Sequence, residues 1–175
     1  MERLLYGITC ARRPRNVVAV GTFCGNTLAW VVGPACEPGK CYAADRLVGL
    51  DVDEKAVGIA RGNFAALPPN NVEVLLEDGH AYLERTDFPI DLLYLDAHGP
   101  LPGTDGPSTK LIYLTLLERA YDRMPEGGLV VAHDTTPEWF VRRAGKYLEY
   151  VRDRSRFSES ISLEPDHEGL EVSMK

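Results

Sequence analysis

Short runs of apolar residues alternate with amphipathic stretches along most of the chain. A continuous apolar run of four to six residues is typical of a strand that is covered on both faces. Apolar positions spaced three and four apart indicate a helix with one buried side. Strands are predicted at 17–20, 47–51, 72–76, 90–95 and 129–132. Helices are predicted at 27–32, 54–66, 81–85, 111–120 and 137–153.

Two more strands are predicted at 157–163 and 170–174, joined by a short polar turn at 165–169. A connection this short requires the two strands to pair antiparallel. The earlier alternation of strands and helices favours a parallel sheet. We therefore predict one α/β domain over 1–175: a Rossmann-like, doubly wound sheet of five parallel strands plus a C-terminal antiparallel hairpin. Helices cover both faces, and a short segment, 1–16, precedes the first strand.

Composition and charge narrow the classes of function. The 175 residues are 45% hydrophobic and 26% charged, which is ordinary for one globular domain. The net charge of −7 offers no positive field for phosphates, so we expect neither a nucleic-acid nor a membrane partner. The chain has no signal-peptide pattern, no apolar run of about 20 residues and only four cysteines. These features predict a cytoplasmic protein with a small-molecule partner.

Candidate chemistry follows the predicted strands. In an open α/β sheet, ligands bind beyond the carboxyl ends of the strands. The first strand is followed by a glycine loop, and the others are followed by acidic residues and histidines. These positions are 21–27, Asp51, 78–80, 96–98 and 133–135.

The glycine loop and Asp51 together favour a nucleoside ligand. Gly21 and Gly25 are separated by three residues, and the third glycine of the dinucleotide fingerprint is missing. A loop of this kind alone could simply be a turn, and Asp51 alone could be a solvated charge. A carboxylate at the end of the second strand can, however, accept hydrogen bonds from both hydroxyls of a ribose.

These segments resemble the catechol O-methyltransferase-like and macrocin O-methyltransferase-like enzymes, a group within the class I S-adenosylmethionine-dependent methyltransferases. Residues 20–27 look like the first motif of these enzymes, and 49–53 look like their ribose-binding strand end. Residues 91–96 resemble the fourth motif, 124–131 the approach to the fifth strand, and 168–175 the final hairpin strand. The resemblance covers 17–175.

The resemblance implies a function and a set of site residues. It implies methyl transfer from S-adenosylmethionine to a small molecule of secondary metabolism, with a hydroxyl oxygen as the atom that is methylated. Its cofactor-binding positions are Gly21, Thr22, Phe23, Gly25, Asn26, Thr27, Asp51, Val52, Asp78, Gly79, His80, Asp96 and His98. Asp96, His133 and Asp134 would hold Mg²⁺ or another divalent cation. The catalytic candidates are Asp96, His98 and His133.

Other interpretations remain open. Without a metal, His133 or His98 would take the proton of the acceptor. Asp134 could instead cap the following helix, and His80 and His98 could be solvated loop histidines. Gly99 stands where the catechol enzymes place a lysine, so that base is absent at this position.

Rival functions follow from the same departures. The chain could be a cofactor-binding partner without catalysis of its own, whereas the glycine spacing disfavours a nicotinamide-dependent oxidoreductase. The Pro/Gly-rich loop 99–107 is predicted to gate the acceptor. A homodimer could cover apolar surface that the short N-terminal segment leaves open.

Overall fold

The computed structural model describes residues 1–36, 40–66, 71–107 and 109–175. Within these ranges the strands form one seven-stranded sheet, in the order β3-β2-β1-β4-β5-β7-β6. The strand bounds are β1 Asn16–Val20, β2 Arg46–Asp51, β3 Val72–Leu76, β4 Leu92–Leu95, β5 Leu129–His133, β6 Glu159–Leu163 and β7 Leu170–Met174.

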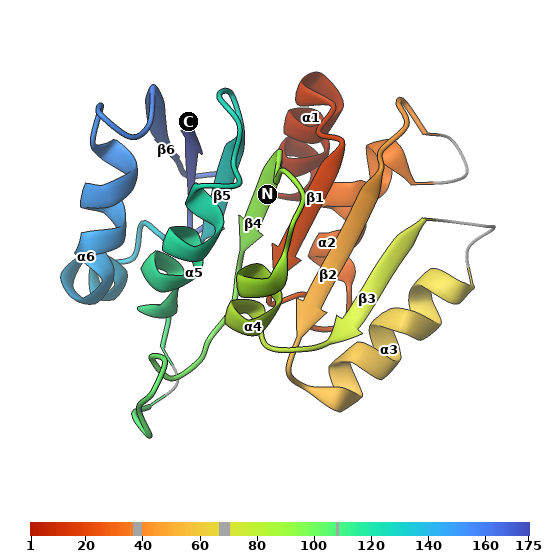
Figure 1. The fold of residues 1–175 in the computed structure, drawn as a ribbon, viewed down its shortest axis with the longest axis horizontal. Helices are drawn as coiled ribbons and strands as arrows, with labels where there is room; N and C mark the ends of the chain where they lie inside the picture. Colours follow the sequence, from red (N-terminus) through yellow and green to blue (C-terminus); the bar gives the residue numbers. More distant parts are fainter. Residues whose placement is uncertain (37–39, 67–70, 108) are drawn as a thin grey trace.

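The predicted topology is confirmed. Strands β1 to β5 pair in parallel, with Val20 opposite Leu50 on β2 and Leu95 on β4. Strand β7 runs antiparallel to both β5 and β6, so the C-terminal hairpin extends the sheet at one edge. The carboxyl ends of β1, β2, β3 and β4 meet at one edge of the sheet, the lower edge in Figure 1.

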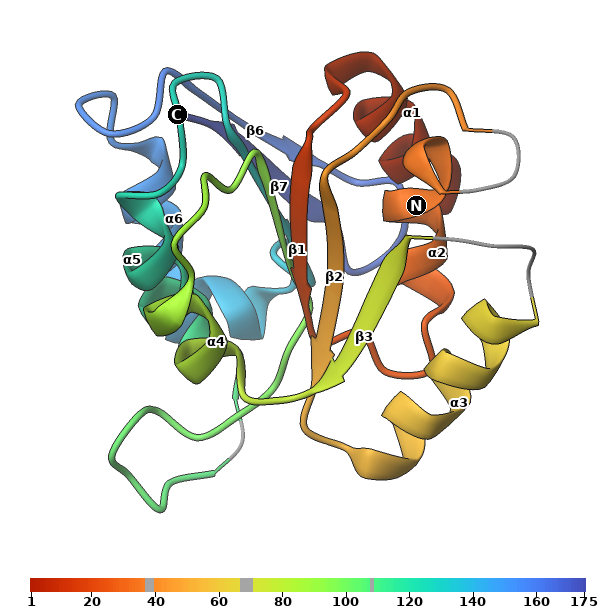
Figure 2. The ribbon, with the colours of Figure 1, turned by 45° about the vertical axis from the view of Figure 1, so that its right-hand side comes forward.

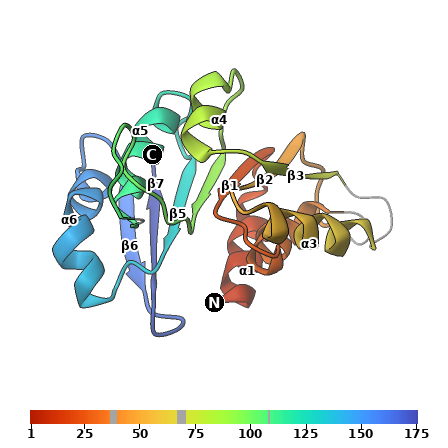
Figure 3. The ribbon, with the colours of Figure 1, turned by 90° about the horizontal axis from the view of Figure 1, so that it is seen from below.

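The helices form two layers, one on each face of the sheet (Figures 2 and 3). Helices α1, α2 and α3 cover one face, and α4, α5 and α6 cover the other. Their bounds are α1 Glu2–Arg12, α2 Asn26–Val32, α3 Glu54–Ala65, α4 Gly79–Arg85, α5 Ile112–Tyr121 and α6 Glu138–Arg152, with a short 3-10 turn at Gly33–Ala35.

The central strand β1 shows why the apolar runs are continuous. Val17 and Ala19 pack into the core beneath α1, α2 and α3, whereas Val18 and Val20 pack beneath α4, α5 and α6. All four side chains are buried. Because neighbouring side chains point to opposite faces, a strand covered on both faces needs an apolar residue at every position.

Helix α1 was not predicted from the sequence. It packs against α2 and lies toward the amino ends of the strands (Figures 1 and 2). At its C-terminus the Arg12 guanidinium donates to the carbonyl of Gly127, just before β5, at 2.6 Å. The helix therefore lies toward the end of the sheet opposite the predicted ligand site.

No helix within the described residues has the length and apolar content that a membrane crossing requires. The Pro68-Pro69 pair, which is expected to end the predicted helix 54–66, lies outside the described residues.

Candidate functional site

A cavity of about 690 Å³ lies at the carboxyl ends of the parallel strands. Its volume is in the range of small-molecule and cofactor sites. Most of the predicted cofactor-binding residues line it: Gly21, Phe23, Asp51, Val52, Asp78, Gly79, His80, Asp96 and His98. A cavity therefore lies where a ligand is expected, beyond the carboxyl ends of the strands.

The glycine loop approaches the neighbouring strand closely. Gly21 adopts a φ of +85°, which favours glycine. A Cβ atom at this position would lie 2.4 Å from the carbonyl oxygen of Asp96. Only glycine therefore allows the end of β1 to lie directly against the end of β4.

Asp51 ties this loop to the end of β2. One carboxylate oxygen accepts from the backbone N–H of Phe23 at 2.7 Å, and the other accepts from that of Asp53 at 3.0 Å. Phe23 is 67% exposed and has a φ of +45°, a strained value for a residue with a side chain. Each carboxylate oxygen has a second acceptor position, so Asp51 can still receive a diol.

Asp78, Gly79 and His80 form the third side of the cavity at the start of α4. The Asp78 carboxylate accepts from the backbone N–H of Ala81 at 3.0 Å and so caps the helix. Nε2 of His80 lies 2.8 Å from Oγ1 of Thr115 on α5. The partly buried His80 ring is therefore held by a neighbouring helix and is not a freely solvated side chain.

The remaining predicted cofactor positions do not line the cavity. Thr22 is buried beneath the loop, and Gly25 is the N-cap residue of α2 with a φ of +89°. Asn26 and Thr27 form the first turn of that helix. These four residues shape the loop from behind.

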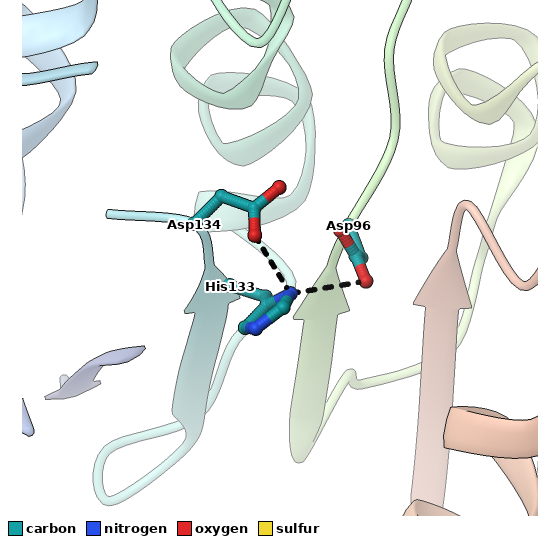
Figure 4. A group of neighbouring side chains, drawn as sticks. All are labelled: Asp96, His133 and Asp134. Carbon is teal, nitrogen blue, oxygen red and sulfur yellow. Dashed lines mark ion pairs between the residues drawn. The ribbon is translucent and has the colours of Figure 1, made fainter. Parts of the chain in front are cut away.

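The three predicted metal ligands do come together (Figure 4). His133 ends β5, Asp134 follows it with a φ of +56°, and Asp96 follows β4. Nδ1 of His133 lies 3.0 Å from Oδ1 of Asp134 and 3.4 Å from Oδ2 of Asp96. On the other side of the ring, Nε2 lies 3.4 Å from Oδ2 of Asp166, in the β6–β7 turn.

Charge interactions set the protonation of this cluster. Burial alone would lower the pKa of His133, but the carboxylates around its ring outweigh burial and raise it. Burial would raise the pKa of Asp96, but His133 and Lys110 outweigh it and lower it. His98, in contrast, has its pKa lowered by burial and by the charge of Lys110.

Lys110 is the site residue that the sequence did not reveal. Its side chain is fully buried, and Nζ lies 2.7 Å from Oδ1 of Asp96 and 2.6 Å from Oδ2 of Asp134. An antiparallel bridge between Gly99 and Thr109 closes the preceding loop and returns the chain to the end of β4. The alternative that Asp134 caps the next helix is wrong. Helix α6 begins at Glu138, its N-cap residue is Pro137, and no side chain caps it, whereas Asp134 pairs with Lys110.

An ammonium group therefore lies where the predicted divalent cation would have to bind. Its single positive charge already contacts both carboxylates, and a second cation bound between them would be repelled by it. With Lys110 in place, Asp96, His133 and Asp134 do not fit a divalent ion.

The loop after β4 forms the outer wall of the cavity. Residues 99–104 line it, and the segment extends beyond the lower edge of the sheet in Figure 1. No Lys or Arg side chain is among the lining residues of the described chain, whereas Asp51, Glu77, Asp78 and Asp96 are. The cavity therefore favours ligands that carry positive charge.

Fold and site together define the class of protein: a Rossmann-like α/β domain with a cavity of small-molecule size at the strand ends. A family model described as a methyltransferase domain matches residues 18–135. The chain belongs to this methyltransferase-domain family.

Solved structures share this fold at low sequence identity. An O-methyltransferase from Bacillus cereus in complex with SAH is 19% identical and has a TM-score of 0.72. The match covers 99% of this chain and 80% of that one. The O-methyltransferase TomG from Streptomyces achromogenes, solved with SAM, is 20% identical with a TM-score of 0.67, over 99% and 78% of the two chains.

Curated relatives carry a different name. Polyamine aminopropyltransferase 2 of Hyperthermus butylicus is 28% identical over 78% of this chain and 44% of its own length. The polyamine aminopropyltransferase of Thermococcus onnurineus is 27% identical over 91% of this chain and 54% of its own length. The chain thus spans about half the length of these relatives. The narrower resemblance to catechol and macrocin enzymes is not confirmed by these matches.

Proposed function

We propose that the chain transfers the methyl group of S-adenosylmethionine to a small acceptor. The observation that carries this proposal is the cavity itself, in which Asp51 and the Gly21 loop lie at the ends of adjacent strands in a methyltransferase-domain chain. The donor is a sulfonium cation, which suits a cavity lined by carboxylates. Among the described residues, no Lys or Arg lines this cavity.

In this proposal each wall of the cavity contacts a different part of the donor. Asp51 accepts hydrogen bonds from the ribose hydroxyls, Val52 and the 78–80 segment border the adenine, and the Gly21 loop surrounds the methionine portion. Methyl transfer from a sulfonium is an in-line displacement, so the main task of the site is alignment. Alignment of this kind can contribute about 7–11 kcal/mol to barrier lowering.

The acceptor in this proposal is a hydroxyl oxygen, and His98 is its general base. His98 lines the cavity beside Asp96. His133 is less suited, because Nδ1 lies between two carboxylates and Nε2 faces a third. His98 would take the hydroxyl proton as the oxygen attacks the methyl carbon and the carbon–sulfur bond breaks.

The loop 99–107 is proposed to close over the acceptor, because its first half already forms the cavity wall. Protection of this loop from proteolysis when S-adenosylhomocysteine and an acceptor are added supports the proposal. An unchanged cleavage pattern contradicts it.

A second candidate function is aminopropyl transfer, favoured by the similarity to polyamine aminopropyltransferases. The chemistry is parallel: an amine attacks the propyl carbon of a decarboxylated sulfonium donor instead of the methyl carbon. The leaving group is then methylthioadenosine. A carboxylate-lined cavity would also suit a cationic amine acceptor.

Analysis of the thioether product distinguishes the two functions. The protein is incubated with S-adenosylmethionine and hydroxylated acceptors, and separately with the decarboxylated donor and a diamine. Acceptor-dependent S-adenosylhomocysteine supports methyl transfer. Methylthioadenosine formed only with the decarboxylated donor supports aminopropyl transfer and overturns the main proposal. Asp51→Asn serves as the control and is expected to lower either activity.

A further inference from the structure

The ammonium group of Lys110 is surrounded by hydrogen-bond acceptors, as a bound cation would be. It lies just before α5, its side chain is 0% exposed, and Nζ contacts Asp96, Asp134 and the hydroxyl of Tyr113 at 2.6–2.7 Å. An ammonium group has three hydrogens to donate. Three acceptors at hydrogen-bond distance therefore satisfy it completely.

All four oxygens of the Asp96 and Asp134 carboxylates also have partners. Oδ1 of Asp96 and Oδ2 of Asp134 face Lys110, whereas Oδ2 of Asp96 and Oδ1 of Asp134 face Nδ1 of His133. The hydroxyl of Tyr94 also lies 3.4 Å from Oδ2 of Asp96. Each oxygen that a divalent cation would need thus already faces a nitrogen.

The complete burial of Lys110 indicates that the surrounding residues are arranged to hold its ammonium group. A lysine side chain is almost never fully buried unless it is paired, because removing its charge from water is costly. Here the pairing comes from two different strand ends, β4 and β5, and from α5. The residues are therefore arranged around an ammonium group and would have to rearrange to accept a metal ion.

We propose that Lys110 replaces a divalent metal ion in this site: its ammonium group holds the Asp96 and Asp134 carboxylates, and the site binds no divalent cation. Lys110 is a positioning residue, because it is fully buried and does not line the cavity. The inference concerns the same site as the proposed methyl transfer, but it can be tested without donor or acceptor. A failure of the proposed function therefore leaves it unaffected.

Binding of Mn²⁺ tests this inference directly. Free Mn²⁺ is measured by electron paramagnetic resonance during titration of the wild type, Lys110→Met and the double variant Lys110→Met/Asp134→Asn. Met keeps an unbranched stem of similar volume without the charge. Lys146→Met, at an exposed position on α6, removes the same charge away from the site. Circular dichroism establishes that each variant is folded.

The expected result is that the wild type and Lys146→Met leave Mn²⁺ free up to millimolar concentration. Lys110→Met should bind at least about tenfold more tightly, because a repelling charge is removed, and the double variant should lose this gain. Micromolar binding by the wild type that Asp134→Asn abolishes would overturn the inference. So would a folded Lys110→Met variant that gains no affinity.

A second measurement uses only the wild type, in case Lys110→Met does not fold. A cation that binds the folded state raises the melting temperature. After dialysis against a chelator, 1 mM Mn²⁺, about the millimolar limit set above, should leave the melting temperature of the wild type unchanged. A rise that disappears in Asp134→Asn would overturn the inference.

Discussion

Substitution of Gly21 by alanine tests the close contact on which the cavity depends. The added Cβ would lie 2.4 Å from the carbonyl oxygen of Asp96 and 2.6 Å from the Cα of Ala97. Both are backbone atoms, which cannot rotate away. The φ of +85° adds a conformational penalty of about 1–2 kcal/mol for a residue with a Cβ.

The magnitude can be separated into two parts with a matched control. Gly103 also has a positive φ, +74°, but a Cβ there would meet no atom within 4 Å. Gly103→Ala should therefore lose only the conformational part, about 1–2 kcal/mol. Gly21→Ala should lose a further 1–3 kcal/mol or so from overpacking.

Urea unfolding of the two variants and the wild type measures these losses. We expect Gly21→Ala to be less stable than Gly103→Ala by about 1–3 kcal/mol. Equal losses of the free energy of unfolding, within about 0.5 kcal/mol, would show that the close approach of β1 to β4 does not constrain the loop.

Two other predictions concern a partly buried histidine and a fully buried glutamate. Burial lowers the pKa of His80, so its contribution to stability is present above its unfolded pKa of about 6.5 and is lost as pH falls through the lower folded value. The stability difference between wild type and His80→Gln should thus shrink in urea unfolding below about pH 6.5; a constant difference contradicts this. Glu171 is fully buried and receives both Nε and Nη2 of Arg152, at 2.8 and 2.9 Å. Glu171→Gln should cost about 1–3 kcal/mol, and exposed Glu159→Gln under about 0.5 kcal/mol; equal losses in urea unfolding would contradict the assigned pairing.

Much of the fold could be predicted because it depends on local patterns. The apolar runs identify β1 and β2 because both faces are covered, and Asp53 caps α3 by accepting from the backbone N–H of Ala56 as expected of its residue type. The start of α5 was predicted one residue too early. Leu111 is the N-cap residue before the helix, and Ile112 is the first residue of its buried face.

Helix α1 was missed because its sequence carries a weak pattern. Only Leu5 and Thr9 are fully buried, and Gly7 interrupts the apolar positions. Its stability comes from packing against α2, which a local pattern does not report. The homodimer predicted from the short N-terminal segment stays a prediction, and sedimentation at varied concentration would test it.

The site was predicted only where its residues directly follow strands. Asp51, Asp96 and His133 stand at strand ends, and the topology of a parallel sheet brings such ends together. Lys110 lies fourteen residues after Asp96 along the chain, and the contact depends on how the intervening loop returns. Nothing in the local sequence distinguishes this lysine from an exposed one. The ion pairs of Lys110 with the two carboxylates therefore could not be predicted.

Calorimetric titration with S-adenosylhomocysteine measures whether the cavity binds the donor nucleoside with Asp51 as the ribose acceptor. The comparison is between wild type, Asp51→Asn and Asp53→Asn, which keeps the helix cap because Asn caps as well as Asp. We expect micromolar or tighter binding for the wild type and Asp53→Asn. Asp51→Asn should bind at least about tenfold more weakly, since hydrogen bonds to a charged acceptor are worth about 1.5–3 kcal/mol. No binding by the folded wild type, or equal binding by Asp51→Asn, would contradict this expectation.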